Sequence, residues 1–187
     1  MKSFLYSSIL GAIIAYLWSS FSWMFLSWHN LDFKTFDNES EVVKVLSNEA
    51  KERGYYVIPE FAPNNPDKEC DQEKWEGQAK RGPFAFMSIL PKGKTRGMST
   101  SMVYQFLSFL VASILASILL MKSSRVTTFE AAKFCSMMGI FGAIISVFPL
   151  WNWWEFPTLS TVVCIIDSGI TWFLAGLAMG KVLHTHT

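Results

Sequence analysis

Four long apolar stretches constrain this chain more than any other feature of its sequence. They cover about residues 4–28, 99–121, 131–150 and 158–183. Each holds roughly twenty apolar or small residues, which as a helix is enough to cross a hydrocarbon core about 30 Å thick. The sequence therefore predicts a mainly α protein, a bundle of four transmembrane helices.

The polar segment between the first two stretches carries its own helix and strand signals. Asn38 followed by Glu41 is typical of a helix start, and Gly54 is a natural end for that helix. Residues 55–58 and 84–90 favour strands, with a loop and one short helical turn between them. We therefore expect a small α+β cap inserted between helices 1 and 2. The predicted parts are helix 1 over residues 1–28, the cap over 29–98, and helices 2–4 with a tail over 99–187.

Positive charges predict the orientation in the membrane. Lys2 precedes the first apolar stretch, Lys122 follows the second and Lys181 closes the fourth, whereas the connection 151–157 has no Lys or Arg. Short cytoplasmic loops are enriched in these residues. We expect both termini and the C-terminal tail in the cytoplasm and the insert 29–98 outside.

Composition excludes several classes of protein. The formal net charge is +1, so nothing favours nucleic acid as a partner. The three cysteines are far apart and form no C-x-x-C pair, which argues against a disulfide scaffold or a thiol redox enzyme. No nucleophile triad, phosphate-binding glycine loop or HExxH motif occurs. We expect a protein that is not an enzyme, and the sequence leaves any cofactor unknown.

Asp167 is the most informative single residue. It follows Thr158, the start of the last apolar stretch, by nine residues, about 14 Å along a helix axis. A carboxylate near the middle of a membrane is costly and usually has a role. Thr171 lies one turn away and Gln105 can approach from the second stretch. Asp167 is either a proton, cation or ligand site or a hydrogen-bonded residue that locks helices together. No Lys, Arg or His within the helices is expected to pair with it.

His29 lies at the outer end of the first apolar stretch, after Trp28. It either caps the helix or ligates a metal together with Glu155. Trp23 and Trp28 fit an aromatic belt at the outer membrane interface.

Small residues recur every three or four positions in all four apolar stretches, which lets helix backbones approach closely. They belong either to packing within the chain or to a face, foremost the one on the first stretch, that docks another subunit. The stripe residues are Ser7, Gly11, Ala15, Ser19, Gly139, Ala143, Gly176 and Gly180.

Three segments together resemble a group of uncharacterised bacterial inner-membrane proteins. They are residues 22–29 (Ser-Trp-Met-Phe-Leu-Ser-Trp-His), 54–59 (Gly-Tyr-Tyr-Val-Ile-Pro) and 82–86 (Gly-Pro-Phe-Ala-Phe). The resemblance implies one helix, an external insert and three further helices in a bacterial cytoplasmic membrane, and no activity. In that group a proline precedes the Trp-His pair, where this chain has Ser27.

The sequence supports three functional hypotheses. The first is a non-enzymatic accessory or assembly subunit of a larger membrane complex, with other membrane subunits or a second copy as partners besides the lipid bilayer. The second is a small transporter or ligand-binding membrane protein that uses Asp167, with Thr171 and Gln105 nearby. The third is a metal-dependent activity at the outer surface near His29 and Glu155.

Overall fold

The computed structural model describes residues 2–60, 71–123 and 127–184. It is mainly helical, with one two-stranded sheet. The chain divides into two compact units, which are described separately. Residues 1–33 and 96–187 form the membrane unit, and residues 34–95 form the insert unit.

The membrane unit contains four helices long and apolar enough to cross a membrane, as predicted. A short 3-10 helix, η1, follows the first of them after a single extended residue, Leu26. The capping box of Thr127 and Glu130 starts α5 before the predicted residue 131. The elements are α1 (Lys2–Phe25), η1 (Ser27–Asn30), α4 (Met98–Lys122), α5 (Thr128–Trp154) and α6 (Thr158–His184).

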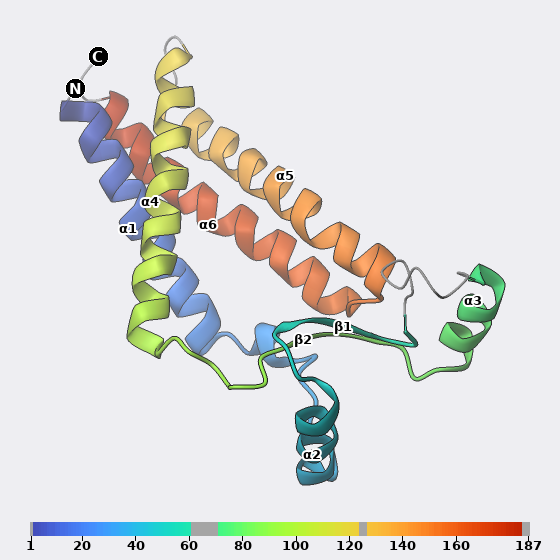
Figure 1. Ribbon diagram of the computed structural model, residues 1–187. Coiled ribbons are helices and arrows are strands. Elements are labelled where there is room, and N and C mark those ends of the chain that lie inside the picture. Colours follow the sequence, from blue (N-terminus) through green and yellow to red (C-terminus); the bar gives the residue numbers. More distant parts are fainter. Residues whose placement is uncertain (1, 61–70, 124–126, 185–187) are drawn as a thin grey trace. The chain divides into compact units, whose positions relative to one another are not determined.

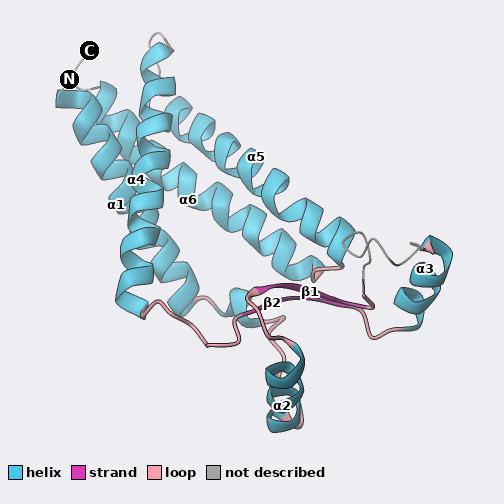
Figure 2. Cartoon of the chain, viewed as in Figure 1, coloured by secondary structure: helices cyan, strands magenta, loops and turns pink. Residues whose placement is uncertain are grey.

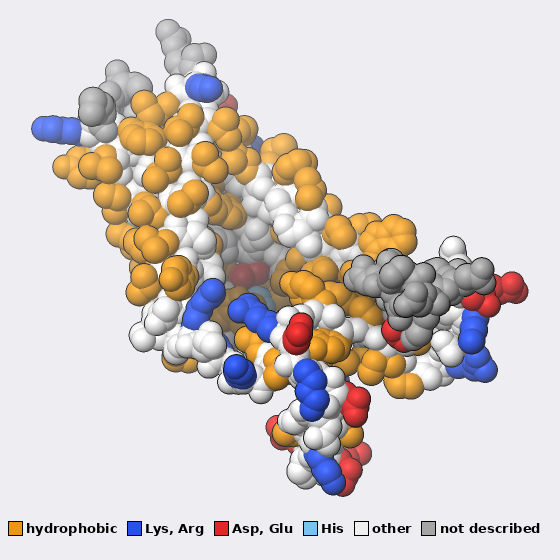
Figure 3. Space-filling view, in the orientation of Figure 1, with side chains coloured by type: hydrophobic (Ala, Val, Ile, Leu, Met, Phe, Trp, Pro, Cys, Tyr) orange, Lys and Arg blue, Asp and Glu red, His pale blue; other side chains and the backbone are white. Residues whose placement is uncertain are grey.

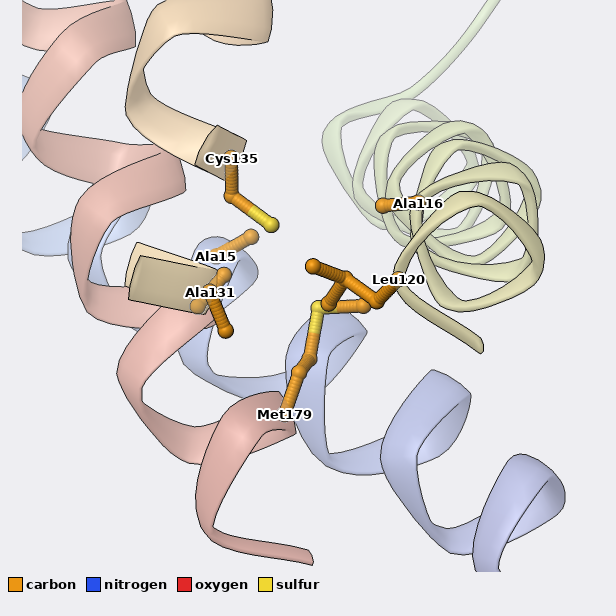
Figure 4. Packing of buried hydrophobic residues seen from close by; sticks show 7 residues of the cluster. Ala15, Ala116, Leu120, Ala131, Cys135 and Met179 are labelled. Carbon is orange, nitrogen blue, oxygen red and sulfur yellow. The ribbon is translucent and has the colours of Figure 1, made fainter. Parts of the chain in front are cut away.

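These helices pack in the order α4, α1, α6, α5 (Figure 1). The ends of α4 and α5 that flank residues 124–126 lie near each other, and the two helices diverge toward the opposite end. At the near end, Leu120 of α4 lies in one buried cluster with Ala131 of α5 and Met179 of α6 (Figure 4). We call this the terminal end, since α1 begins and α6 ends there, and the opposite one the insert end. The membrane unit is therefore wedge-shaped, open between α4 and α5.

Close contacts between helices account for most of the small-residue stripes. A Cβ added to Gly176 of α6 would lie 2.7 Å from the Cα of Ala132 in α5, and one added to Gly180 would lie 2.7 Å from the Cβ of Ala131. A Cβ at Gly139 would lie 2.5 Å from the ring of Trp172. These glycines let α5 and α6 pack backbone to backbone.

The stripe on α1 is also used inside the chain. Ser7, Gly11 and Ala15 are buried, and a Cβ at Gly11 would lie 2.6 Å from the sulfur of Met179. Ser19 and Ala143, at the margins of their stripes, are half-buried. The face of α1 that the sequence offered as a docking face for another subunit is therefore occupied by α4 and α6.

The insert unit combines two helices and an antiparallel pair of strands (Figure 2). Asn38 caps α2 as predicted, but that helix ends at Glu49, and Gly54 begins β1 instead of ending the helix. The predicted short turn is a ten-residue helix, α3, capped by Asp71. Strands β1 and β2 are antiparallel, with Tyr56 opposite Met87. The elements are α2 (Glu39–Glu49), β1 (Gly54–Ile58), α3 (Gln72–Arg81) and β2 (Ala85–Ile89).

The length of α3 was underestimated because its sequence has almost no apolar face. Only Trp75 supplies a large apolar side chain, and its ring packs edge-on against Phe84 at 6.3 Å between centroids. The Trp75 indole also donates to the carbonyl of Pro59 over 3.3 Å. These contacts come from residues outside the helix, so periodicity within it cannot reveal them.

Candidate functional site

Asp167 lies about a third of the way along α6, nine residues after Thr158, and is only 7% exposed. The indole N–H of Trp18 in α1 donates to its Oδ1 over 2.8 Å. One turn on, the hydroxyl of Thr171 donates to the backbone carbonyl of Asp167 over 2.7 Å, not to the carboxylate. The carboxylate therefore faces α1, and Thr171 supports the helix backbone beside it.

His29 is the basic partner that the sequence analysis did not expect. Its Nε2 lies 3.5 Å from Oδ2 of Asp167, and the residue is only 8% exposed. The extended backbone of Leu26 ends α1, and η1 folds back so that the imidazole points toward the membrane unit's interior. The sequence analysis considered basic partners only within the apolar helices, whereas His29 reaches Asp167 from η1, outside them.

A second layer of side chains holds the imidazole in place. The hydroxyl of Ser22 lies 2.9 Å from Nε2 of His29 and accepts a hydrogen bond of 3.1 Å from the indole of Trp28. The ring of Trp23 stacks on the imidazole with 4.1 Å between centroids and 7° between planes. We call Asp167, His29, Trp18, Ser22 and Trp28 the Asp167 cluster.

The hydrogen-bond roles within the cluster allow two proton arrangements. Because an indole N–H only donates, Trp28 uses a lone pair of Ser22 and leaves the hydroxyl proton free for Nε2 of His29. If Nε2 carries a proton instead, it donates to Ser22 or points at Asp167. The contacts therefore fit either tautomer of the His29 imidazole without moving a side chain.

A second acid, Asp32, fastens the segment that carries His29. Its Oδ2 accepts from the backbone N–H of Ser160 over 2.8 Å and from the Ser160 hydroxyl over 2.6 Å. Ser160 lies in the first turn of α6, where free N–H groups and the helix dipole favour an anion. Residues 26–33 thus contact α6 at two positions. Asp32 binds Ser160 in the first turn of α6, and His29 lies beside Asp167 further along that helix.

Asp32→Ala is expected to lower the free energy of unfolding by about 1–2 kcal/mol, because it removes both bonds at the start of α6. Denaturant titration of the purified protein, followed by circular dichroism, measures the change. Asp37→Ala is the matched control, since Asp37 is exposed in the insert unit. A loss no greater than that of the control would show that Asp32 does not anchor this segment.

The remaining predicted site residues lie apart from the Asp167 cluster. Gln105 is exposed on α4, where its amide donates to Ser108 over 3.4 Å. Glu155 is exposed and ends α5 with a positive φ of 53°. In residues 2–60, 71–123 and 127–184 no three His, Cys, Asp or Glu side chains gather as a metal site would require. His29 faces Asp167, and no hydrogen bond or ion pair joins it to Glu155 among these residues.

Sequence reasoning found Asp167 and singled out His29 but did not bring them together. Trp18 and Ser22 lie one turn apart on the same face of α1. This spacing was the sequence pattern that could have indicated a polar contact surface on α1 for Asp167 and His29. Trp23 and Trp28 were assigned to an aromatic belt, whereas Trp28 and the stacked Trp23 also position His29.

A groove runs between α4 and α5 over the floor made by α6. Its volume is about 420 Å³, and its walls include Ala112 of α4 and Gly142 of α5, with Ser168 and Trp172 of α6 beneath. Figure 3 shows a hollow on this face of the membrane unit, with acidic and histidine atoms visible at its floor. Ser168 is the sequence neighbour of Asp167, whose side chain keeps 10% of its surface exposed.

Comparison with protein-family models, with curated proteins and with solved structures gave no match. The resemblance to bacterial inner-membrane proteins therefore stays an expectation from the sequence.

Proposed function

We propose that this chain is a multi-pass membrane protein that binds a small cationic or hydrogen-donating ligand at Asp167, as a ligand-binding protein or small transporter. The observation that carries this proposal is a carboxylate buried within an apolar helix and only partly hydrogen-bonded. Ionisable side chains at such depth are costly and commonly mark ligand, ion or proton pathways.

The carboxylate has acceptor capacity to spare. An ionised carboxylate offers about four acceptor positions. Trp18 fills one of them, and His29, at 3.5 Å, lies beyond the roughly 3.2 Å limit of a good N–H···O bond. A ligand N–H or O–H group therefore has a free position on Asp167.

The pair of groups also defines the ligand chemistry. A carboxylate attracts a positive charge, and an imidazole can accept or return a proton as the ligand arrives or leaves. An ammonium group, a protonated amine or a proton itself fits this pair. A metal centre is less well supported, because the cluster offers one carboxylate and one imidazole, fewer than the usual three protein ligands.

The test compares the wild type with Asp167→Asn, which keeps the shape and can still accept from Trp18. Both proteins are purified in detergent and heated with a panel of small amines, quaternary ammonium ions, Na⁺ and K⁺. A true ligand at about ten times its dissociation constant should raise the wild-type midpoint by roughly 3 °C and leave the variant unchanged. If no compound separates the two folded proteins, the proposal fails.

The orientation and location remain part of this proposal. Lys2, Lys122, Lys133 and Lys181 lie toward the terminal end of the membrane unit, which supports cytoplasmic termini and an external insert 29–98. The sequence resemblance supports a bacterial inner membrane. In such a membrane the four helices would form a bundle around the Asp167 cluster.

A second candidate is an accessory or assembly subunit of a larger membrane complex. The insert unit favours it, because neither α2 nor α3 has a buried residue, while Val43, Tyr55 and Ile58 are exposed. So small a unit buries little core alone and is suited to binding a partner. Gentle purification from the native membrane with mass spectrometry tests this: a stoichiometric set of membrane proteins supports it, and a solitary, stable protein counts against it.

A further inference from the structure

The geometry points to a single-chain lipophilic amine as the ligand of Asp167, entering sideways from the bilayer through the groove between α4 and α5. This inference rests on the proposed binding site at Asp167 and adds the class of ligand and its route.

The groove is space that the protein's own packing leaves open. Gly139, Gly176 and Gly180 are small because another helix touches them, but a Cβ added to Gly142 would meet nothing within 4 Å. Gly142 nevertheless lines the groove, together with Ala112 across from it on α4. A larger side chain at position 142 would fit without a clash, so the glycine there leaves space that a ligand can occupy. A volume of about 420 Å³ is within the usual range for small-molecule sites.

Three polar residues lie at a similar height along α4, α5 and α6, and one of them, Ser146, lines the groove. Gln105 is seven residues from the insert end of α4, Ser146 eight from that of α5, and Asp167 nine from that of α6. At 1.5 Å per residue these are depths of about 10 to 14 Å, within the hydrocarbon region. Polar side chains at this depth in three different helices suit a ligand whose polar head stops there.

Gln105 adds a polar side chain on α4 beyond the residues that line the groove. It lies two turns from Ala112 on the same face of α4 and is exposed. Its amide N–H₂ donates to Ser108, and its side-chain oxygen accepts no hydrogen bond from the described residues. An unsatisfied amide in hydrocarbon is costly, and a ligand head group would remove that cost.

Charge selects an amine over other head groups. The residues that line the groove include no Lys or Arg, and the nearest charged side chain in α6 is the carboxylate of Asp167. An anionic head would meet no Lys or Arg among these lining residues and would be repelled by the Asp167 carboxylate. An ammonium would form a charge-assisted hydrogen bond to Asp167, with Gln105 and Ser146 near the same level. The alkyl chain would then lie between α4 and α5 among Ala112, Leu115 and Met138.

The test uses hexadecylamine as the probe, with hexadecanol and hexadecanoic acid as matched chains. The protein is reconstituted in phosphatidylcholine vesicles, and brominated forms of the probes quench tryptophan fluorescence, with Trp172 in the groove and Trp18 on Asp167 as reporters. The amine should bind the wild type about tenfold more tightly than the alcohol, and Asp167→Asn should abolish that preference.

Variants in the groove wall separate this inference from the proposed site. Gly142→Phe should weaken both amine and alcohol about tenfold by filling the groove, whereas Ile145→Phe, on an exposed face of α5, should change neither. If small amines bind in an Asp167-dependent way but Gly142→Phe has no effect on hexadecylamine, the groove route is wrong and the site stands. If neither small nor long amines bind, the site itself is wrong.

Cross-linking of Ser146→Cys to a membrane protein, without amine binding, would overturn the inference in favour of a partner helix.

Discussion

Gly176→Leu is expected to cost at least about 3 kcal/mol of folding free energy and to leave little folded protein in the membrane. A Cβ at this position would lie 2.7 Å from the Cα of Ala132 and 2.8 Å from the carbonyl oxygen of Ala131. Both are backbone atoms of α5, so no rotamer change can relieve the clash. The helices α5 and α6 would have to separate along their shared interface.

Denaturant unfolding of the purified protein, followed by circular dichroism, measures this cost. Gly142→Leu is the matched control, because the same substitution there enters open space in the groove. The control should keep wild-type stability within about 1 kcal/mol. Equal stability of Gly176→Leu and Gly142→Leu would contradict the close packing of α5 against α6.

Asp167→Leu should destabilise the protein by about 3 kcal/mol, and Asp167→Asn by about 1 kcal/mol or less. Leucine removes the acceptor of the Trp18 N–H and leaves His29 facing an apolar side chain. Asparagine keeps an oxygen within reach of Trp18 and can also pair with the imidazole. Unfolding titrations of the three proteins at neutral pH give the comparison.

A double variant checks the source of this effect. Replacing both partners, with Asp167→Leu and His29→Phe together, should recover part of the stability that Asp167→Leu loses. The reason is that the double variant leaves no buried polar side chain of this pair without its partner. Additive losses from the two single changes would mean that Asp167 and His29 do not interact. A folded Asp167→Asn protein is also the condition that makes the ligand test above interpretable.

The sequence predicted the elements better than their contacts. The four membrane helices follow from continuous apolar character, and the predicted ends lie within a few residues of those found. The strands β1 and β2 and the helix α2 follow from local signals such as the cap at Asn38. The full length of α3 did not follow, because Trp75 is stabilised by Phe84 and Pro59 outside that helix.

The candidate site shows the same division. The position of Asp167 along α6 was enough to single it out, because distance along a helix can be calculated from residue numbers and the rise per residue. The partner could not be predicted, since His29 lies 138 positions away in the sequence and outside every apolar helix. Gln105 was expected to approach Asp167 from the second apolar stretch, but no hydrogen bond joins the two among the described residues.

The sequence by itself determined that this chain has four apolar helices, a polar insert and one deep carboxylate, since hydrophobic length, capping and periodicity are properties of neighbouring residues. Only the tertiary structure decided that α1 turns back at Leu26 to bring His29 to Asp167, and that α4 and α5 diverge to leave a groove. These outcomes depend on which small residues meet across helices. Gly176 and Gly142 cannot be told apart from the sequence. In the structure the backbone of α5 packs directly against Gly176, whereas Gly142 faces open space.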